Sequence, residues 1–172
     1  MSDDSMSNDN QQRTSSWTPP SAVDRGRLLD RTKSIAIVGA SSKASRASSF
    51  VLTYLRSSLC HFTVYPVNPR ETEIQGLTCY PSLDALPEVP DMVDVFRRAS
   101  DCPDVANEAV AIGAKSLWLQ LGVWSDEAAE IAHSAGLDVV MDRCTKIEHA
   151  RFAGGLHLAG FNTGVIDSSR SR

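Results

Sequence analysis

Residues 35–48, IAIVGASSKASRAS, carry the strongest indication of the fold in this sequence. Four apolar residues lead into Gly39, and small and hydroxyl side chains follow, together with Lys43 and Arg46. A short, wholly apolar run is typical of a buried parallel strand. Apolar side chains then recur at helical spacing, at Ala47, Phe50, Val51, Tyr54 and Leu55. The stretch therefore predicts a strand, a tight turn and an amphipathic helix.

The same alternation continues along the chain. Further strands are predicted for HFTVYPV (61–67), GLTCY (76–80), MVDVF (92–96), SLWLQL (116–121) and LDVVM (137–141). Helices are predicted to begin after Ser21, Ser82, Asp101 and Ser125, and two of them to end at Gly113 and Gly136. Alternating strands and helices with short connections imply a parallel sheet covered on both faces. We therefore predict a single α/β domain, a Rossmann-like doubly wound parallel sheet, over residues 21–150.

The two ends of the chain differ from this pattern. Residues 1–20 are polar apart from Trp17 and are predicted to form a disordered N-terminal tail. Residues 151–172 contain apolar side chains and four glycines, which disfavour a long helix. We expect this C-terminal extension to pack on the domain or on a second subunit, and a homodimer is the hypothesis that follows.

Composition excludes several classes of protein. The 172 residues carry a formal net charge of −4 without a basic run, which disfavours nucleic acid as a partner. No apolar stretch approaches the roughly 20 residues that span a bilayer, and the N-terminus does not resemble a signal peptide. The four cysteines are scattered without metal-ligand spacing, so we expect reduced thiols. These features predict a cytoplasmic protein with no membrane partner.

A ligand site is predicted at the carboxyl ends of the strands, where open α/β sheets bind their ligands. Small residues let a phosphate approach the backbone amides at the start of the first crossover helix. The residues that meet this requirement are Gly39, Ala40, Ser41 and Ser42, with Lys43 and Arg46 adding positive charge. The alternative interpretation is an ordinary strand-to-helix turn, because a turn with a single glycine is weakly diagnostic.

The residues around this turn favour one class of phosphorylated ligand. The G-x-G-x-x-G fingerprint is absent, and Asn68 and Arg70 follow the second strand where an NAD-binding domain needs an acid. Six cations belong to the predicted edge: Lys43, Arg46, Arg70, Arg97, Arg98 and Arg143. A ligand with a diphosphate and a further phosphate would engage more of them than a mononucleotide. An NADP-like ligand is the alternative, which the missing glycines disfavour.

Five segments in this order resemble a known family. IAIVGASSKASRAS, VYPVNPR, DMVDVFR, AIGAKSLWLQLGV and VVMDRCTKIE are similar to segments of the small, single-domain CoA-binding proteins of bacteria. Those proteins are similar in turn to the N-terminal CoA-binding domain of the succinyl-CoA synthetase alpha subunit. The resemblance covers roughly residues 25–150. It implies a Rossmann-like fold that binds coenzyme A, or an acyl-CoA, along the carboxyl edge of the sheet.

The resemblance also implies roles for individual residues. The turn from Gly39 to Ser42, with Lys43 and Arg46, would receive phosphate oxygens. The nucleotide would be flanked by Val67, Asn68, Pro69 and Arg70, and by Phe96 and Arg97. The pantetheine arm would follow Gln120, Leu121 and Gly122, with Cys144, beside Arg143, towards its thiol end.

The sequence predicts binding rather than catalysis. The ligase alpha subunit continues into a second domain with a phosphorylated histidine, and no histidine here has a comparable glycine-rich context. No serine or cysteine has a recognisable base, so we expect a non-catalytic binding or regulatory protein. Two alternatives remain: an enzyme or subunit that acts on CoA thioesters, and an NAD(P)-responsive module. A further hypothesis is that Cys144 forms a mixed disulfide with the ligand under oxidation.

Overall fold

A five-stranded parallel sheet forms the centre of the molecule. The structure, a computed structural model, describes residues 16–153. The sheet has the order β2-β1-β5-β6-β7, and every neighbouring pair is parallel. Its strands are β1 (Ser34–Val38), β2 (Thr63–Val67), β5 (Met92–Val95), β6 (Ser116–Leu119) and β7 (Asp138–Val140). The predicted α/β class and the doubly wound parallel sheet are confirmed.

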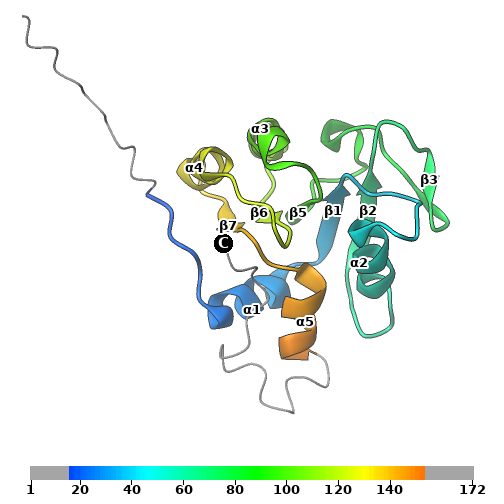
Figure 1. Cartoon of the computed structure of the whole chain (residues 1–172), viewed down its shortest axis with the longest axis horizontal. Coiled ribbons are helices and arrows are strands. Elements are labelled where there is room, and N and C mark those ends of the chain that lie inside the picture. The colour runs from blue at the N-terminus through cyan, green and yellow to red at the C-terminus, as the bar shows by residue number, and fades with distance from the viewer. Residues whose placement is uncertain (1–15, 154–172) are drawn as a thin grey trace, which may run out of the picture.

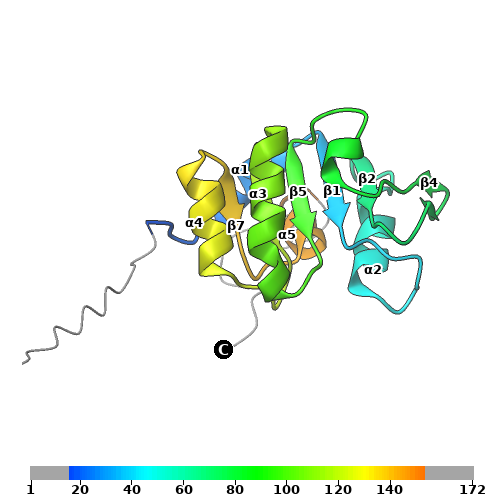
Figure 2. The same cartoon turned by 90° about the horizontal axis from the view of Figure 1, so that it is seen from above.

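Helices cover both faces of this sheet (Figure 1). One face carries α3 (Cys102–Ile112) and α4 (Asp126–Ser134), which lie side by side above the strands in Figure 2. The other face carries α1 (Ala22–Arg31), α2 (Ala47–Leu55) and α5 (Thr145–Ala153). Two short 3-10 turns, η1 (Leu83–Ala85) and η2 (Ala99–Asp101), precede β5 and α3. This arrangement leaves the carboxyl ends of the strands uncovered by helices.

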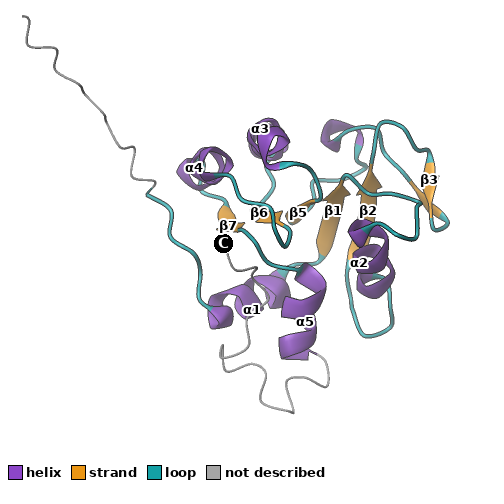
Figure 3. Cartoon of the chain, in the orientation of Figure 1, coloured by secondary structure: helices purple, strands orange, loops and turns teal. Residues whose placement is uncertain are grey.

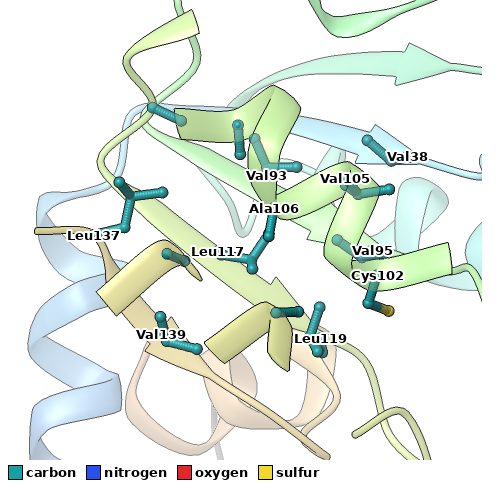
Figure 4. Packing of buried hydrophobic residues seen from close by; sticks show 14 of the residues in the cluster. Val38, Val93, Val95, Cys102, Val105, Ala106, Leu117, Leu119, Leu137 and Val139 are labelled. Atoms are coloured by element: carbon teal, nitrogen blue, oxygen red, sulfur yellow. The ribbon is translucent and has the colours of Figure 1, made fainter. Parts of the chain in front are cut away.

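The central strands are buried on both faces, which explains their uninterrupted apolar sequences. The cluster between the sheet and α3 and α4 contains side chains of β5, β6 and β7 together with Val105 and Ala106 (Figure 4). The cluster on the opposite face contains Ile35, Leu52 and Leu55. Burial of these two faces drives the strand pairing and holds the strand ends in a fixed relation.

All four predicted residues stand at helix N-caps, but Ser82 before η1 and Asp101 before α3 make no side-chain capping hydrogen bond. Ser21 caps α1 through its hydroxyl, and Ser125 caps α4 in the same way. Gly113 ends α3 in the left-handed conformation, and Gly136, also with positive φ, follows α4. These predictions are confirmed because capping depends on local hydrogen bonds that the sequence specifies directly.

The structure differs from the local predictions at three places. Val51 and Leu55 of the predicted apolar stripe of α2 are buried together with Ser48, Ser49 and Leu52, whereas Phe50 is 59% exposed. The segment 76–80 contains a strand as predicted, but only over two residues and outside the central sheet. It supplies β4 (Leu77–Thr78), which pairs with β3 (Glu73–Ile74) in a small hairpin beside β2. The helix α5, over residues that the sequence left without an element, packs against α1 and α2.

Trp17 docks on the edge of the sheet before the first helix begins. Its indole is 8% exposed and donates a hydrogen bond of 3.1 Å to the carbonyl oxygen of Val139 in the edge strand β7. It also packs edge-on against Trp124, at 5.6 Å between ring centroids. Ordered packing therefore starts ahead of Ser21. The remaining residues of the predicted tail (1–15) and of the C-terminal extension (154–172) lie outside the described residues.

Candidate ligand-binding cleft

The strand order places a crevice between β1 and β5. The chain leaves β1 towards β2 on one side and later returns to β5 on the other side, so the connections diverge at this point. Open parallel sheets bind ligands at such a switch point, outside the carboxyl ends of the strands. The loops that leave β1 and β2 at this edge are drawn in teal in Figure 3. The candidate site therefore begins at Gly39 and Phe96, which follow β1 and β5.

Gly39 is required by the geometry of this crevice. Its φ is +85°, and a Cβ at this position would lie 2.8 Å from the carbonyl oxygen of Phe96. Its amide donates a 3.0 Å hydrogen bond to the carbonyl oxygen of Val67 at the end of β2. The absence of a side chain lets the first crossover loop pass directly over β5. A ligand in the cleft can therefore lie close to the backbone.

The turn after Gly39 leads into a helix without a side-chain cap. The hydroxyl oxygen of Ser41 accepts a 3.2 Å hydrogen bond from the amide of Lys43, which shapes the turn. Arg46 is the N-cap residue of α2, and its side chain makes no capping hydrogen bond. The first amides of a helix have no acceptor within the helix, so those of Ala47 and Ser48 are suited to an anion. By contrast, α1 and α4 are capped by serine hydroxyls.

A cleft of about 480 Å³ opens on this turn. Segments from three crossover loops line it: Gly39, Ala40, Ser41, Lys43, Arg46, Ala47, Ser48, Asn68, Arg70, Glu71, Phe96 and Arg97. A second hollow of about 410 Å³ shares Asn68, Arg70, Phe96 and Arg97 with the cleft and adds Pro69, Arg98 and Asp101. Because the two hollows share four residues, they form one elongated groove along the carboxyl edge of β2, β1 and β5.

The cleft is strongly cationic. Lys43, Arg46, Arg70 and Arg97 line it, against one carboxylate, that of Glu71. Within residues 16–153 no salt bridge joins Lys43, Arg46 or Arg70 to an acid. In the adjoining hollow, by contrast, Arg98 is paired with Asp101 at 3.2 Å. Three exposed cations without a paired acid around one helix N-terminus favour an anionic ligand.

Asn68 connects the first two loops of the cleft. Its side-chain nitrogen Nδ2 donates a 2.7 Å hydrogen bond to the carbonyl oxygen of Ala40, and its side-chain oxygen Oδ1 accepts one of 2.9 Å from the backbone amide of Arg70. These contacts hold the turn after β1 against the loop after β2. Asn68 therefore positions both Arg70 and the turn from Gly39 to Ser42. The sequence alone did not predict this structural role.

Ten of the seventeen predicted site residues line the groove, and seven do not. Val67 is buried in the core at the end of β2. Ser42 follows Ser41 in the turn and is exposed; it is not a lining residue, but its amide donates to Glu71, which is one. The other five, at the ends of β6 and β7, are not part of the groove: Gln120, Leu121, Gly122, Arg143 and Cys144. Their role as a path for a ligand remains a prediction.

Gln120 belongs to a buried polar cluster. Its side-chain amide donates hydrogen bonds of 2.8 and 3.0 Å to the two carboxyl oxygens of Asp94 in β5, and one of 2.7 Å to the hydroxyl oxygen of Thr145. Asp94 is fully buried, and this desolvation raises the pKa of its carboxyl to about 7, although its hydrogen bonds lower it. The cluster ties β5 and β6 to the start of α5.

Cys144 is half-buried after the end of β7. Burial is the largest cause that raises the pKa of its thiol above the usual range. Nearby Arg143 donates instead to the carbonyl oxygen of Asp142, at 2.8 Å. Cys144 packs on the apolar cluster beside α2 and does not line the groove. The proposed mixed disulfide with a ligand therefore remains a hypothesis.

Several residues of the groove were not predicted from the sequence. Ala47 and Ser48 form the first turn of α2, which the small-residue pattern could have indicated. Glu71 follows Arg70 in the loop after β2, and its carboxylate accepts hydrogen bonds of 3.2 and 3.1 Å from the amide of Ser42. The sequence does not indicate that Glu71 contacts Ser42, because residues 42 and 71 come together only in the folded chain.

The fold and the groove define an open parallel α/β domain with a cationic cleft at its topological switch point. The chain belongs to the CoA binding domain family, whose model matches residues 33–150. It is 34% identical over 131 residues to the uncharacterized protein YneT of Bacillus subtilis, which covers 76% of this chain and 96% of that protein. The family predicted from the five sequence segments is thus confirmed.

Larger ligases contain a similar domain. The chain is 28% identical over 122 residues to the ADP-forming acetate–CoA ligase I of Archaeoglobus fulgidus, which amounts to 65% of this chain but 18% of the ligase. Among solved structures, a hypothetical protein from Pyrococcus horikoshii OT3 superposes with a TM-score of 0.73 at 36% identity, over 78% of this chain and 96% of that one. The dinucleotide-forming acetyl-coenzyme A synthetase 1 of Ca. Korarchaeum cryptofilum superposes with a TM-score of 0.61 at 28% identity. The match covers 67% of this chain and 27% of the synthetase chain.

Proposed function

We propose that this protein binds coenzyme A, or an acyl-CoA, in the groove at the carboxyl edge of β1, β2 and β5. The observation that carries the proposal is the uncapped N-terminus of α2 beneath Lys43, Arg46 and Arg70, at the switch point of the sheet. The family of the chain supports the identity of the ligand. The diphosphate would lie on the turn from Gly39 to Ser42, with guanidinium groups around it.

The binding role is proposed to be non-catalytic. The cleft is lined by no histidine or cysteine among residues 16–153, so its serines lack a neighbouring base. The side chain of His149, for example, is hydrogen-bonded to the hydroxyl of Tyr54 at 3.0 Å, away from the cleft residues. The protein would then act as a CoA carrier or sensor.

A second candidate function is that of a module that acts with other chains on CoA thioesters. The similarity to part of an ADP-forming acetate–CoA ligase favours it. In that case a partner would supply the catalytic groups, and this chain would supply the CoA site. Turnover of an acyl-CoA by the isolated protein would instead indicate an enzyme in its own right.

Calorimetric titration of CoA, acetyl-CoA, NAD and NADP tests the proposal. We expect CoA to bind and Arg46→Ala to weaken this binding about tenfold, because a charge-assisted contact to phosphate is lost. Arg27→Ala is the matched control, since Arg27 lies on α1 with its side chain 72% exposed and outside the cleft. Binding of NAD with no response to CoA would reject the proposal in favour of a dinucleotide module.

A further inference from the structure

The carboxylate of Glu71 lies where the proposed diphosphate would bind. Its two oxygens accept hydrogen bonds of 3.2 and 3.1 Å from the amide of Ser42, inside the turn that follows β1. Glu71 also lines the cleft, together with Lys43 and Arg46. A carboxylate with two oxygens and a negative charge resembles one face of a phosphate group. The cationic turn is therefore already occupied by an anion of the protein itself.

The contact involves the side chain of Glu71, and the backbone on either side is held independently. The amide of Glu71 donates to the carbonyl oxygen of Asn68 at 3.4 Å, and the amide of Cys79 donates to that of Thr72 at 2.8 Å. Glu71 is half-buried, whereas Arg70 and Thr72 on either side are exposed. The carboxylate can therefore rotate towards solvent without a change in the loop, which would expose the Ser42 amide.

A bound diphosphate and this carboxylate exclude each other. Both require the same amide donor, and two anions at that distance repel in a partly desolvated cleft. The ligand can bind only to the fraction of molecules in which the carboxylate has left the turn. The apparent affinity is then lowered by that fraction.

We propose that Glu71 is an autoinhibitory residue, a built-in anionic competitor for the phosphate turn of this protein. The proposal rests on the function proposed above. The carboxylate satisfies the Ser42 amide in the empty site and must be displaced when the diphosphate of CoA arrives. Any ligand that places a phosphate on this amide meets the same competition, whereas contacts elsewhere in the groove do not.

Calorimetric titration of CoA into matched variants of the full chain tests this role. Glu71→Gln removes the charge at constant shape, Glu71→Ala removes the acceptor, and Glu73→Gln removes an exposed charge two residues away in β3. We expect both Glu71 variants to bind CoA roughly 5- to 20-fold more tightly than the wild type. Glu73→Gln should stay within about twofold, because it leaves the turn intact and controls for net charge.

The amide resonance of Ser42 provides a second readout. It should shift in ligand-free Glu71→Ala, and in the wild type it should shift when inorganic pyrophosphate is added. Wild-type binding of CoA with unchanged or weaker affinity in both Glu71 variants would overturn the autoinhibitory role and leave the proposed function standing. Weaker binding would mark Glu71 as a direct ligand contact. No binding of CoA by the wild type or by either variant would reject the proposed function and this inference with it.

Discussion

Gly39 and Phe96 approach so closely that no side chain fits between them. A Cβ on Gly39 would lie 2.8 Å from the carbonyl oxygen of Phe96, and the φ of Gly39 is +85°. The contact joins the ends of β1 and β5, the two strands between which the chain changes direction. The close contact at the base of the proposed CoA site therefore requires glycine at position 39.

Gly39→Ala should damage both the fold and the site. The positive φ and the clash with a backbone oxygen together should lower the free energy of unfolding by at least about 2 kcal/mol. Chemical denaturation measures this loss, and CoA titration measures the loss of binding. Gly76→Ala is the matched control, since its φ is +76° but a Cβ there meets no atom within 4 Å. Equal effects of the two substitutions would show that the close approach to Phe96 is unimportant.

Arg70→Ala should weaken CoA binding about tenfold, and the affinity of the wild type should fall with rising salt concentration. Arg70 is exposed in the cleft and no acid pairs with it within residues 16–153. Its charge is therefore available to a phosphate. Titrations at several concentrations of NaCl should give a shallower salt dependence for the variant. The same slope for variant and wild type would show that Arg70 does not contact the ligand.

Asp94→Asn should stabilise the protein more at pH 8 than at pH 4.5. The pKa of Asp94 is raised to about 7 by burial, from 3.8 for an ordinary aspartate. Between these two values the unfolded chain releases a proton that the folded chain retains, so rising pH favours unfolding until about pH 7. Asparagine does not titrate, so the variant lacks this loss. Relative to the wild type, its free energy of unfolding should therefore rise by at least about 1 kcal/mol across that pH range.

Thermal denaturation of wild type and variant at several pH values checks the role of Asp94. The difference in Tm between the two proteins should grow as the pH rises. Each kcal/mol of difference in the free energy of unfolding corresponds to roughly 2–4 °C. Glu108→Gln, on the exposed side of α3, serves as the control. A gap that is constant between pH 4.5 and pH 8 would contradict the raised pKa.

Trp17 should contribute measurably to stability although it precedes the first helix. Trp17→Ala should lower the free energy of unfolding by about 3 kcal/mol, because a buried aromatic side chain is lost. Trp17→Phe retains most of the packing on Trp124 but loses the donor to Val139, and should lower it by about 1 kcal/mol. Urea denaturation of the two variants separates the contribution of packing from that of the hydrogen bond. An alanine variant as stable as the wild type would show that the docking is unimportant.

Cys144 should react slowly with iodoacetamide at pH 7.5 in the folded protein. Burial raises the pKa of its thiol, so little thiolate is present. The pKa values of Cys60, Cys79 and Cys102 are raised by burial as well. Mass spectrometry should find rapid alkylation only after unfolding. Preferential alkylation of Cys144 in the folded state would instead support the hypothesis of a mixed disulfide with CoA.

The fold was predictable because its signals are local. Each apolar strand, each serine cap and the left-handed glycine after α3 depends on a few neighbouring residues. The same locality explains the errors. Phe50 follows the helical period but is 59% exposed, and α5 has a weak apolar pattern because the side chains that it buries include Glu148, His149 and Arg151. Tertiary packing determines both features, so no local pattern reports them.

The sequence specified which strand ends would meet, since parallel strands present their carboxyl ends at one edge. It also indicated a cationic turn suited to phosphate, and it indicated the family of CoA-binding domains. Only the folded chain showed that the groove is confined to the ends of β1, β2 and β5, with Gln120 turned into the core towards Asp94. Only there do the Ser42 amide and the Glu71 carboxylate come within hydrogen-bonding distance. Hydrogen bonds between distant segments depend on three-dimensional distances, which a residue pattern does not encode.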